Sequence, residues 1–196
     1  MRQYLAEIQK ILNSYRNSFP EDDEFLGFLP KQLEQNDLEI CSRKNFSGHL
    51  TASALLLNKE NNAAFLIHHK FLDRWLQAGG HLDPLEEPIE GARRELAEET
   101  GLTAVALHDW QSKQPYPLDI DSHLIPPNPK KNEFSHYHHD FLYVFVAAES
   151  AEKGNEDSRL QLEEVNDCKW IAFEKLESGD CGKRLARAVR KLKALL

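Results

Sequence analysis

The chain has 196 residues, of which 41% are hydrophobic and 29% charged, a composition typical of a folded domain rather than of a disordered chain. No run of about eighteen apolar residues is present, and the charged N-terminus lacks the apolar centre of a signal peptide, so we expect a cytoplasmic protein without a membrane span. The net charge of −8 argues against binding to nucleic acid or anionic membranes, but it is compatible with a small anionic substrate held through bound cations.

The first part of the chain has helical periodicity. Apolar residues recur at helical spacing over Tyr4–Tyr15, and a second short helix is predicted over Phe25–Glu34. We interpret residues 1–45 as a helical extension, which packs against a main domain of residues 46–196 or against a second subunit.

The pattern then changes to short apolar runs separated by polar turns, which indicates strands. The predicted strands are His49–Leu57, Ala63–His68, Trp75–Ala78, Ala104–Trp110, Leu118–Leu124, Tyr137–Ala147 and Asp167–Ile171. Helices are predicted over Pro88–Thr100 and over Arg184–Leu195, the second with an apolar stripe that reaches Leu196. Strands mixed with two principal helices predict an α/β fold in which helices cover both faces of a sheet.

The helix predicted over Pro88–Thr100 carries an unusual acidic face. Proline suits its first turn, and Gly101 suits a left-handed cap just past its end. Glu95, Glu98 and Glu99 are spaced i, i+3 and i+4, so their carboxylates share one face of the helix. Such a face is either a solvated surface that pairs with neighbouring arginines, or a set of oxygen ligands of the kind that Mg²⁺ or Mn²⁺ prefers.

The segment Gly80–Leu102 resembles the Nudix box, the loop–helix–loop motif that defines the Nudix hydrolase superfamily. Its defining positions, all filled here, are Gly80, Glu86, Arg94, Glu95, Leu96, Glu98, Glu99, Gly101 and Leu102. The resemblance implies a Nudix-type α/β/α sandwich with a mixed sheet. It also implies a Mg²⁺- or Mn²⁺-dependent hydrolase that cleaves the phosphoanhydride (pyrophosphate) bond of a nucleoside diphosphate linked to another moiety.

The same resemblance assigns roles within the box. The implied metal ligands are the carbonyl of Gly80 and the carboxylates of Glu95, Glu98 and Glu99. The implied catalytic residues are Glu95, Glu98 and Arg94, with Glu95 also a candidate base for the attacking water.

Two further box positions, Glu86 and Gly101, are expected to have structural roles. Arg94 is expected to orient a glutamate through a bidentate pair, with Glu86 as one plausible partner. Gly101 is expected to end the helix.

Outside the box, four residues are candidate substrate-binding residues, namely Glu164, His138, Trp75 and Lys131. By resemblance, Glu164 would supply a further acidic group; Lys131 could bind a terminal phosphate, and Trp75 could stack on a base. The alternatives are a strand or helix edge for Glu164, a solvated loop for Lys131 and core packing for Trp75.

The run from His136 to Asp140 is the most unusual cluster outside the box. His136 and His138 alternate, so on a strand they would share a face. They could contact phosphate, relay protons or hold an additional metal, or they could be polar residues at the solvent-exposed start of a strand.

Two other functions remain open at this point. A catalytically silent Nudix-fold sensor would be expected to have lost box carboxylates, and none is missing. Isopentenyl diphosphate isomerase also has a Nudix-like fold but needs a catalytic cysteine and a histidine-rich metal site, and the cysteines here (Cys41, Cys168 and Cys181) lie outside the box. Resemblance and size also lead us to expect a homodimer, with the N-terminal extension as a docking or swapped element.

Overall fold

A computed structural model of the chain describes residues 1–129, 132–148 and 165–196. Within these ranges the strands form one sheet of eight. In chain order they are β1 (His49–Leu57), β2 (Ala63–His69), β3 (Arg74–Leu76), β4 (Ala78–His81), β5 (Val105–Leu107), β6 (Asp119–Ile125), β7 (His136–Ala147) and β8 (Val165–Ala172).

The sheet is mixed and has β1 at its centre. β1 pairs antiparallel with β2 and β4 and parallel with β7, while the outer strands β3, β5, β6 and β8 all pair antiparallel with β2 or β7. All nine residues of β1 are buried, as expected for an apolar strand that is covered on both faces.

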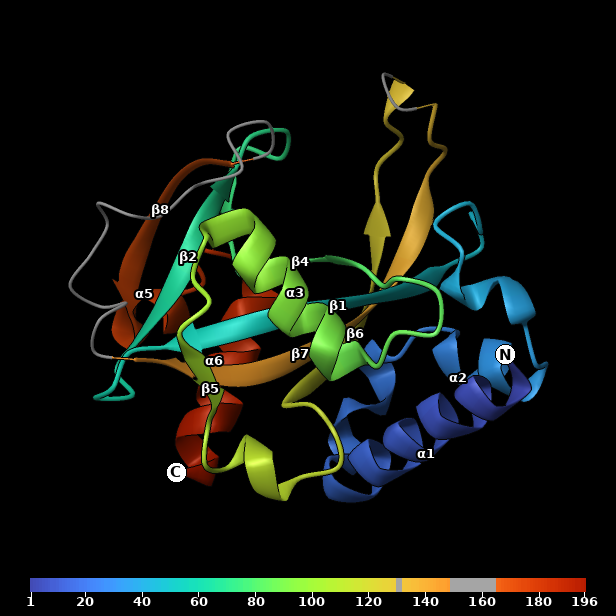
Figure 1. Cartoon of the computed structure of the whole chain (residues 1–196), viewed down its shortest axis with the longest axis horizontal. Coiled ribbons are helices and arrows are strands. Elements are labelled where there is room, and N and C mark those ends of the chain that lie inside the picture. The colour runs from blue at the N-terminus through green and yellow to red at the C-terminus, as the bar shows by residue number, and fades with distance from the viewer. Residues whose placement is uncertain (130–131, 149–164) are drawn as a thin grey trace.

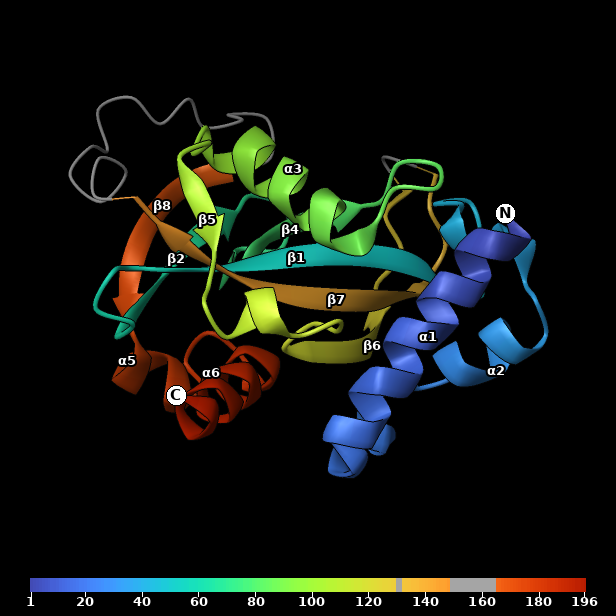
Figure 2. The same cartoon turned by 60° about the horizontal axis from the view of Figure 1, so that its bottom comes forward.

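Helices cover both faces of this sheet. They are α1 (Arg2–Ser18), η1 (Pro20–Phe25), α2 (Leu29–Glu34), η2 (Leu38–Cys41), α3 (Pro88–Thr100), η3 (Gln111–Lys113), α5 (Phe173–Glu177) and α6 (Lys183–Leu195). α3 lies on one face, and α5 and α6 lie on the other (Figures 1 and 2). Two apolar clusters fill the layers, one beneath α3 and α1 and the other beneath α5 and α6. The predicted α/β/α sandwich with a mixed sheet and N-terminal helices is confirmed.

The N-terminal helices are packed into the molecule. Leu5, Ile8, Leu12 and Tyr15 of α1 are buried in the cluster that also contains residues of α3, β1 and β7. The Tyr4 hydroxyl donates a hydrogen bond to the carbonyl of Glu86, 2.7 Å away in the loop before α3. None of the helices in the described part of the chain is both long and apolar enough to cross a membrane.

Four predicted elements differ from the structure. The strand predicted over Trp75–Ala78 is two strands, because the chain changes partner at Gln77, from β2 to β1. The helix predicted over Phe25–Glu34 is interrupted at Gly27, which has a positive φ of 55°. The strand predicted over Ala104–Trp110 is shorter, since the chain turns at His108, whose Nδ1 accepts a hydrogen bond from the Trp110 N–H.

The fourth difference concerns the end of the chain. Leu196 lies beyond α6 and is 59% exposed, so the buried stripe of this helix ends at Leu192.

Candidate active site

The local sequence of α3 fixes which of its sides carries the carboxylates. Pro88 lies in the first turn, and Gly101 ends the helix with a φ of 72° while its N–H donates to the carbonyl of Ala97. Ala92 and Leu96 are fully buried against the sheet. With the apolar stripe held in this way, the neighbouring face of the helix presents its glutamates beside the end of β4.

Two glycines let β4 approach this helix closely. A Cβ atom at Gly80 would lie 2.7 Å from the carboxylate of Glu95, and one at Gly79 would lie 2.5 Å from the Cβ of Ser53. The Gly79 N–H donates a hydrogen bond to Glu99 at 2.9 Å. The backbone of β4 is therefore in contact with the carboxylates of α3, which any larger side chain at these positions would prevent.

Arg94 connects the loop before α3 to the acidic face. Its Nε and Nη2 form a fork with the two oxygens of Glu86, at 2.9 and 2.8 Å, so the predicted pair is present. Nη1 donates to Glu95 at 2.9 Å and to Glu98 at 3.1 Å, and Nη2 also donates to the carbonyl of His81 at 2.8 Å. Arg94 thus contacts carboxylates and backbone, which makes it a positioning residue for the box.

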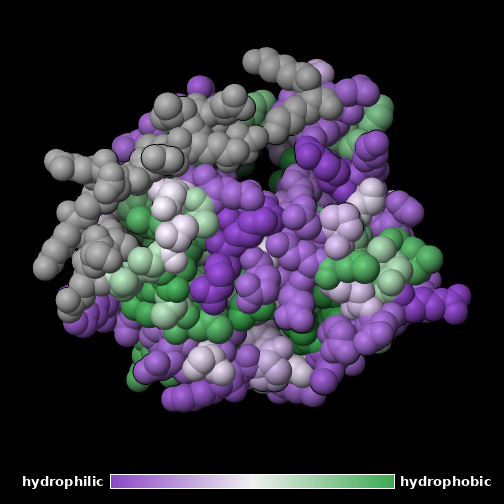
Figure 3. All heavy atoms as spheres, viewed as in Figure 1, coloured by the Kyte–Doolittle hydropathy of each residue, from purple (hydrophilic) through white to green (hydrophobic). Residues whose placement is uncertain are grey.

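The three carboxylates of the acidic face differ in exposure. Glu99 is buried, the side chain of Glu95 is 14% exposed, and that of Glu98 is 50% exposed. Burial raises the pKa of Glu95, although the hydrogen bond from Arg94 acts in the opposite direction. Glu98 is thus the carboxylate most open to solvent. Hydrophilic residues gather over the centre of the face that carries α3 (Figure 3).

Comparison with known proteins identifies the arrangement. A family model described as "NUDIX domain" matches residues 48–192. The chain belongs to the Nudix family. The match begins after the N-terminal helices and includes the whole of the box.

Two curated relatives are named as pyrophosphohydrolases. The chain is 33% identical over 129 residues to a "Probable DHNTP pyrophosphohydrolase" of Lactococcus lactis, covering 66% of this chain and 72% of that protein. It is 31% identical over 108 residues to an "RNA pyrophosphohydrolase" of Bartonella bacilliformis, covering 53% of this chain and 61% of that protein.

The fold is also similar to that of a solved hydrolase. A C. elegans Ap4A hydrolase in a binary complex superposes with a TM-score of 0.55 over 74% of this chain and 96% of that one. The sequence identity is 16%, so this similarity concerns the fold alone.

A cluster of histidines lies on the opposite side of β4 from the glutamates. His136 and His138 do share a face of β7, and the register of the sheet adds His49, His81 and His123 to the same group. The ring centroids of His49, His81 and His138 lie 4.8–5.1 Å from one another. Burial lowers the pKa of His49 and of His138, and the neighbouring imidazoles lower both further.

The sequence alone indicates only the part of this cluster that lies on one strand. The alternation of His136 and His138 was visible, whereas His49 and His81 stand alone in the sequence and join the group only through strand pairing. The available signal for His81 is its position directly after the paired glycines Gly79 and Gly80.

Of the remaining candidate substrate residues, Trp75 lies in the part of the chain that the structure describes. Trp75 lies in β3, where its ring contacts the ring of His68 and the Lys169 ammonium, the latter 3.7 Å from the ring centroid. Its contacts in the structure are thus with β2 and β8. Lys131 and Glu164 lie outside the described residues.

Proposed function

We propose that this Nudix hydrolase cleaves the phosphoanhydride bond of a nucleotide-type diphosphate with Mg²⁺ or Mn²⁺ bound at the box. The observation that carries the proposal is the contact of Glu95 and Glu99 of α3 with the Gly79–Gly80 backbone of β4, with Glu98 joined to Glu95 through Arg94. The carbonyl of Gly80 and the carboxylates of Glu95, Glu98 and Glu99 are the proposed ligands.

The residues present fit a hard divalent cation. All the proposed ligand atoms are oxygens, which Mg²⁺ and Mn²⁺ prefer over nitrogen or sulfur. Space for side chains is absent at Gly80, where a Cβ would collide with Glu95, so the backbone itself lies within reach of the carboxylates. When bound, such a cation would neutralise phosphate charge and lower the pKa of the attacking water.

The protein groups have distinct proposed tasks. Glu98 is half-exposed and faces the side from which substrate can arrive. Glu95 is largely buried and its pKa is raised by that burial, which makes it a better proton acceptor than an exposed carboxylate, and we assign it to take the proton of the attacking water. Arg94, anchored on Glu86, keeps Glu95 and Glu98 in place.

A nucleotide-type substrate is supported by the relatives. The two curated relatives are named for the pyrophosphohydrolysis of DHNTP and of RNA, and the superposed structure is named as an Ap4A hydrolase. These names share a chain of phosphates attached to a nucleoside or a related group. We therefore propose a phosphate chain of this kind as the part of the substrate that the box recognises.

The isomerase alternative is not favoured by the cysteines. Cys168 is buried in β8, Cys181 follows α5, and Cys41 belongs to η2. Burial raises the pKa of Cys41 to about 11, which disfavours the reactive thiolate.

The experiment that tests the proposal compares two isosteric substitutions on the same helix. The purified chain is incubated with Mg²⁺ or Mn²⁺ and a panel of nucleoside triphosphates, dinucleoside polyphosphates, ADP-ribose and nucleotide sugars, and products are separated by chromatography. Glu98→Gln is expected to lower kcat by at least about 100-fold, since it removes a charged ligand without removing volume.

Glu90→Gln is the matched control, because Glu90 is exposed on α3 and pairs with Arg93 away from the acidic face. It should retain full turnover. Turnover that survives chelation of divalent cations, or that is unaffected by Glu98→Gln, would overturn the proposal. A folded chain that is inactive on the whole panel would favour a sensor that has kept the fold.

A further inference from the structure

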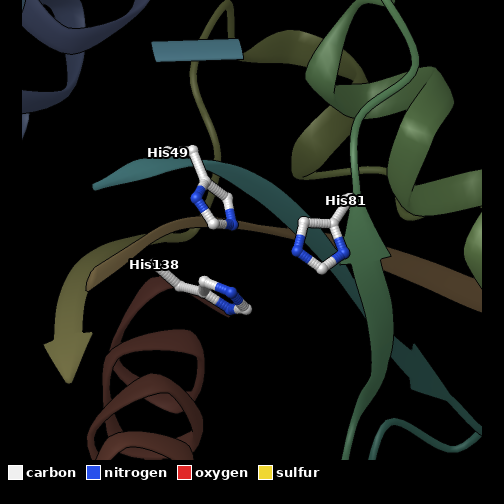
Figure 4. Close-up of side chains that lie close together, drawn as sticks. All are labelled: His49, His81 and His138. Carbon is white, nitrogen blue, oxygen red and sulfur yellow. The ribbon is translucent and has the colours of Figure 1, made fainter. Parts of the chain in front are cut away.

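Strand register brings three histidines from separate strands to one face of the sheet. His49 in β1 is directly opposite His138 in β7, and His81 in β4 is opposite Thr51, two residues along β1 from His49. Since side chains alternate along a strand, all three imidazoles project to the same side. The three rings point towards a common space (Figure 4).

His49 is the most informative member of this group. It is 1% exposed, and its Nδ1 lies 3.1 Å from the carbonyl of Asn45. A carbonyl accepts only, so Nδ1 carries the proton and Nε2 carries the lone pair. Nε2 is buried and has no hydrogen-bond partner among the described residues. A buried acceptor without a partner is costly and calls for a ligand at that atom.

The protonation of His138 follows from a similar chain of contacts. The Nδ1 of His136 lies 2.6 Å from the carbonyl of Phe134, so it is the protonated nitrogen of that ring. The Nε2 of His136 is then an acceptor, and its partner at 3.2 Å, the Nε2 of His138, donates. The lone pair of a neutral His138 is consequently at Nδ1. Backbone carbonyls that fix the tautomer of a histidine are the usual outer partners of metal-binding imidazoles.

We propose that His49, His81 and His138 form a binding site for a transition-metal cation such as Zn²⁺, separate from the carboxylate site of the box. Each residue offers one nitrogen, and the three ligand atoms lie within 4.8 Å of one another. Tetrahedral Zn²⁺ with Zn–N bonds of about 2.0–2.1 Å needs nitrogens about 3.3 Å apart, a contraction that side-chain rotation can supply.

The chemistry of the donors separates this site from the box. Imidazole nitrogen suits Zn²⁺ and its neighbours in the first transition row, whereas Mg²⁺ takes oxygen ligands. Three protein ligands leave a fourth position for water or for an anionic oxygen, as in zinc sites that interact with substrate. A nitrogen-rich metal site is therefore a second place where this chain can hold a phosphate-type anion.

The two sites lie back to back on β4. Gly80 faces α3 and the carboxylate of Glu95, and the next residue, His81, faces the other side of the strand. Arg94 of the box donates to the carbonyl of His81 at 2.8 Å. The position of His81 is thus fixed by the same arginine that orders the glutamates, although the proposed Zn²⁺ site does not depend on hydrolase activity.

The test measures metal binding rather than turnover. Untagged protein is stripped with a chelator and titrated with Zn²⁺ and with Co²⁺, and bound metal is quantified after gel filtration. The stripped wild type and the stripped Glu98→Gln variant are both expected to bind a single Zn²⁺ at the histidines. His138→Asn and His81→Asn are expected to weaken binding by more than about 100-fold, because loss of an outer partner alone weakens metal sites by 10–100-fold.

His68→Asn is the matched control, since His68 lies in β2 and pairs with Asp73 outside the cluster. It should bind Zn²⁺ like the wild type. Bound Co²⁺ should show the strong visible absorption of a nitrogen-ligated, low-coordinate site, and Zn²⁺ should raise the Tm of the wild type but not that of folded His138→Asn.

Three results would overturn the proposal. They are no Zn²⁺ bound by the wild type, equal binding by folded His138→Asn and His81→Asn, and Zn²⁺ that is lost in Glu98→Gln but kept in both histidine variants. The last result would assign the bound Zn²⁺ to the box carboxylates.

Discussion

At the scale of single residues, Arg94 is the side chain on which the order of the box depends. It is fully charged in the folded protein and contacts Glu86, Glu95 and Glu98 within 3.1 Å. The hydrogen bonds to Glu86 lower the pKa of that carboxyl, which keeps the pair ionised. Lysine at this position would keep the charge but lose the planar fork.

Arg94→Lys is expected to lower kcat by about 10–100-fold with a smaller change in KM, because a positioning residue affects the reacting geometry more than substrate binding. Glu86→Gln should have an effect in the same direction. In a double-mutant cycle read by urea unfolding, the two residues should couple by about 1–3 kcal/mol. Additive effects on both stability and kcat would show that the fork does not order the box.

The residues of the box could be identified from the sequence, whereas the histidine cluster could not. Glu95, Glu98 and Glu99 lie within two turns of one helix, so their separation along the chain fixes their separation in space. His49 and His138 are neighbours only because β1 and β7 pair in parallel in a particular register. A single sequence does not encode long-range register in any local pattern.

At the scale of elements, ion pairs join β6 to α6. Asp121 of β6 accepts a hydrogen bond from Arg184 at 2.9 Å and lies 2.9 Å from His123. Burial alone would raise the pKa of Asp121, but the hydrogen bond with His123 and the charge of Arg184 lower it to about 2. The charged form of Asp121 thus stabilises the packing of α6 on the sheet.

This pKa predicts how stability depends on pH. An aspartate in the unfolded chain has a pKa of about 4. Between about pH 4 and 2 the unfolded chain therefore binds a proton at Asp121 that the folded chain does not. The contribution of Asp121 is therefore present above about pH 4, amounts to about 2 kcal/mol, and is lost as the pH falls towards 2.

Urea unfolding of the wild type and of Asp121→Asn measures this contribution. The variant should be less stable by about 2 kcal/mol at neutral pH, and the difference should shrink as the pH falls below about 4. Asp180→Asn, at an exposed position after α5, should match the wild type at each pH. A difference that stays constant down to about pH 2 would contradict the assigned pKa.

The elements themselves were predicted where one periodicity covers the whole element. The predicted helix over Pro88–Thr100 and the predicted strand over His49–Leu57 have the bounds found in the structure. The split between β3 and β4 was missed because both strands have the same local pattern and differ only in their partners. Partner choice is a property of the sheet and leaves no period in the sequence.

At the scale of the whole molecule, the N-terminal helices and the sheet share one apolar core. Leu12 is fully buried in the same cluster as Leu96 of the box helix and Phe141 of β7. A second link is polar: Lys191 of α6 pairs with Asp22 of η1 and with Asp119 of β6. Both links cross the division between residues 1–45 and 46–196, so we predict that the two parts unfold as one cooperative unit.

Leu12→Ala tests this prediction far from the box and outside the residues that match the family. Because Leu12 is 0% exposed, its truncation should lower the free energy of unfolding by about 2–5 kcal/mol, through lost burial and the cavity left behind. The loss should appear in a single unfolding transition, detected alike by far-UV circular dichroism and by tryptophan fluorescence. Every tryptophan lies beyond residue 45, so fluorescence reports on the main domain alone. Asn17→Ala, at an exposed position of the same helix, should leave the transition unchanged. If instead the circular dichroism of Leu12→Ala shows an early partial transition while the fluorescence midpoint stays at its wild-type value, residues 1–45 form an extension that unfolds separately, and the prediction is wrong.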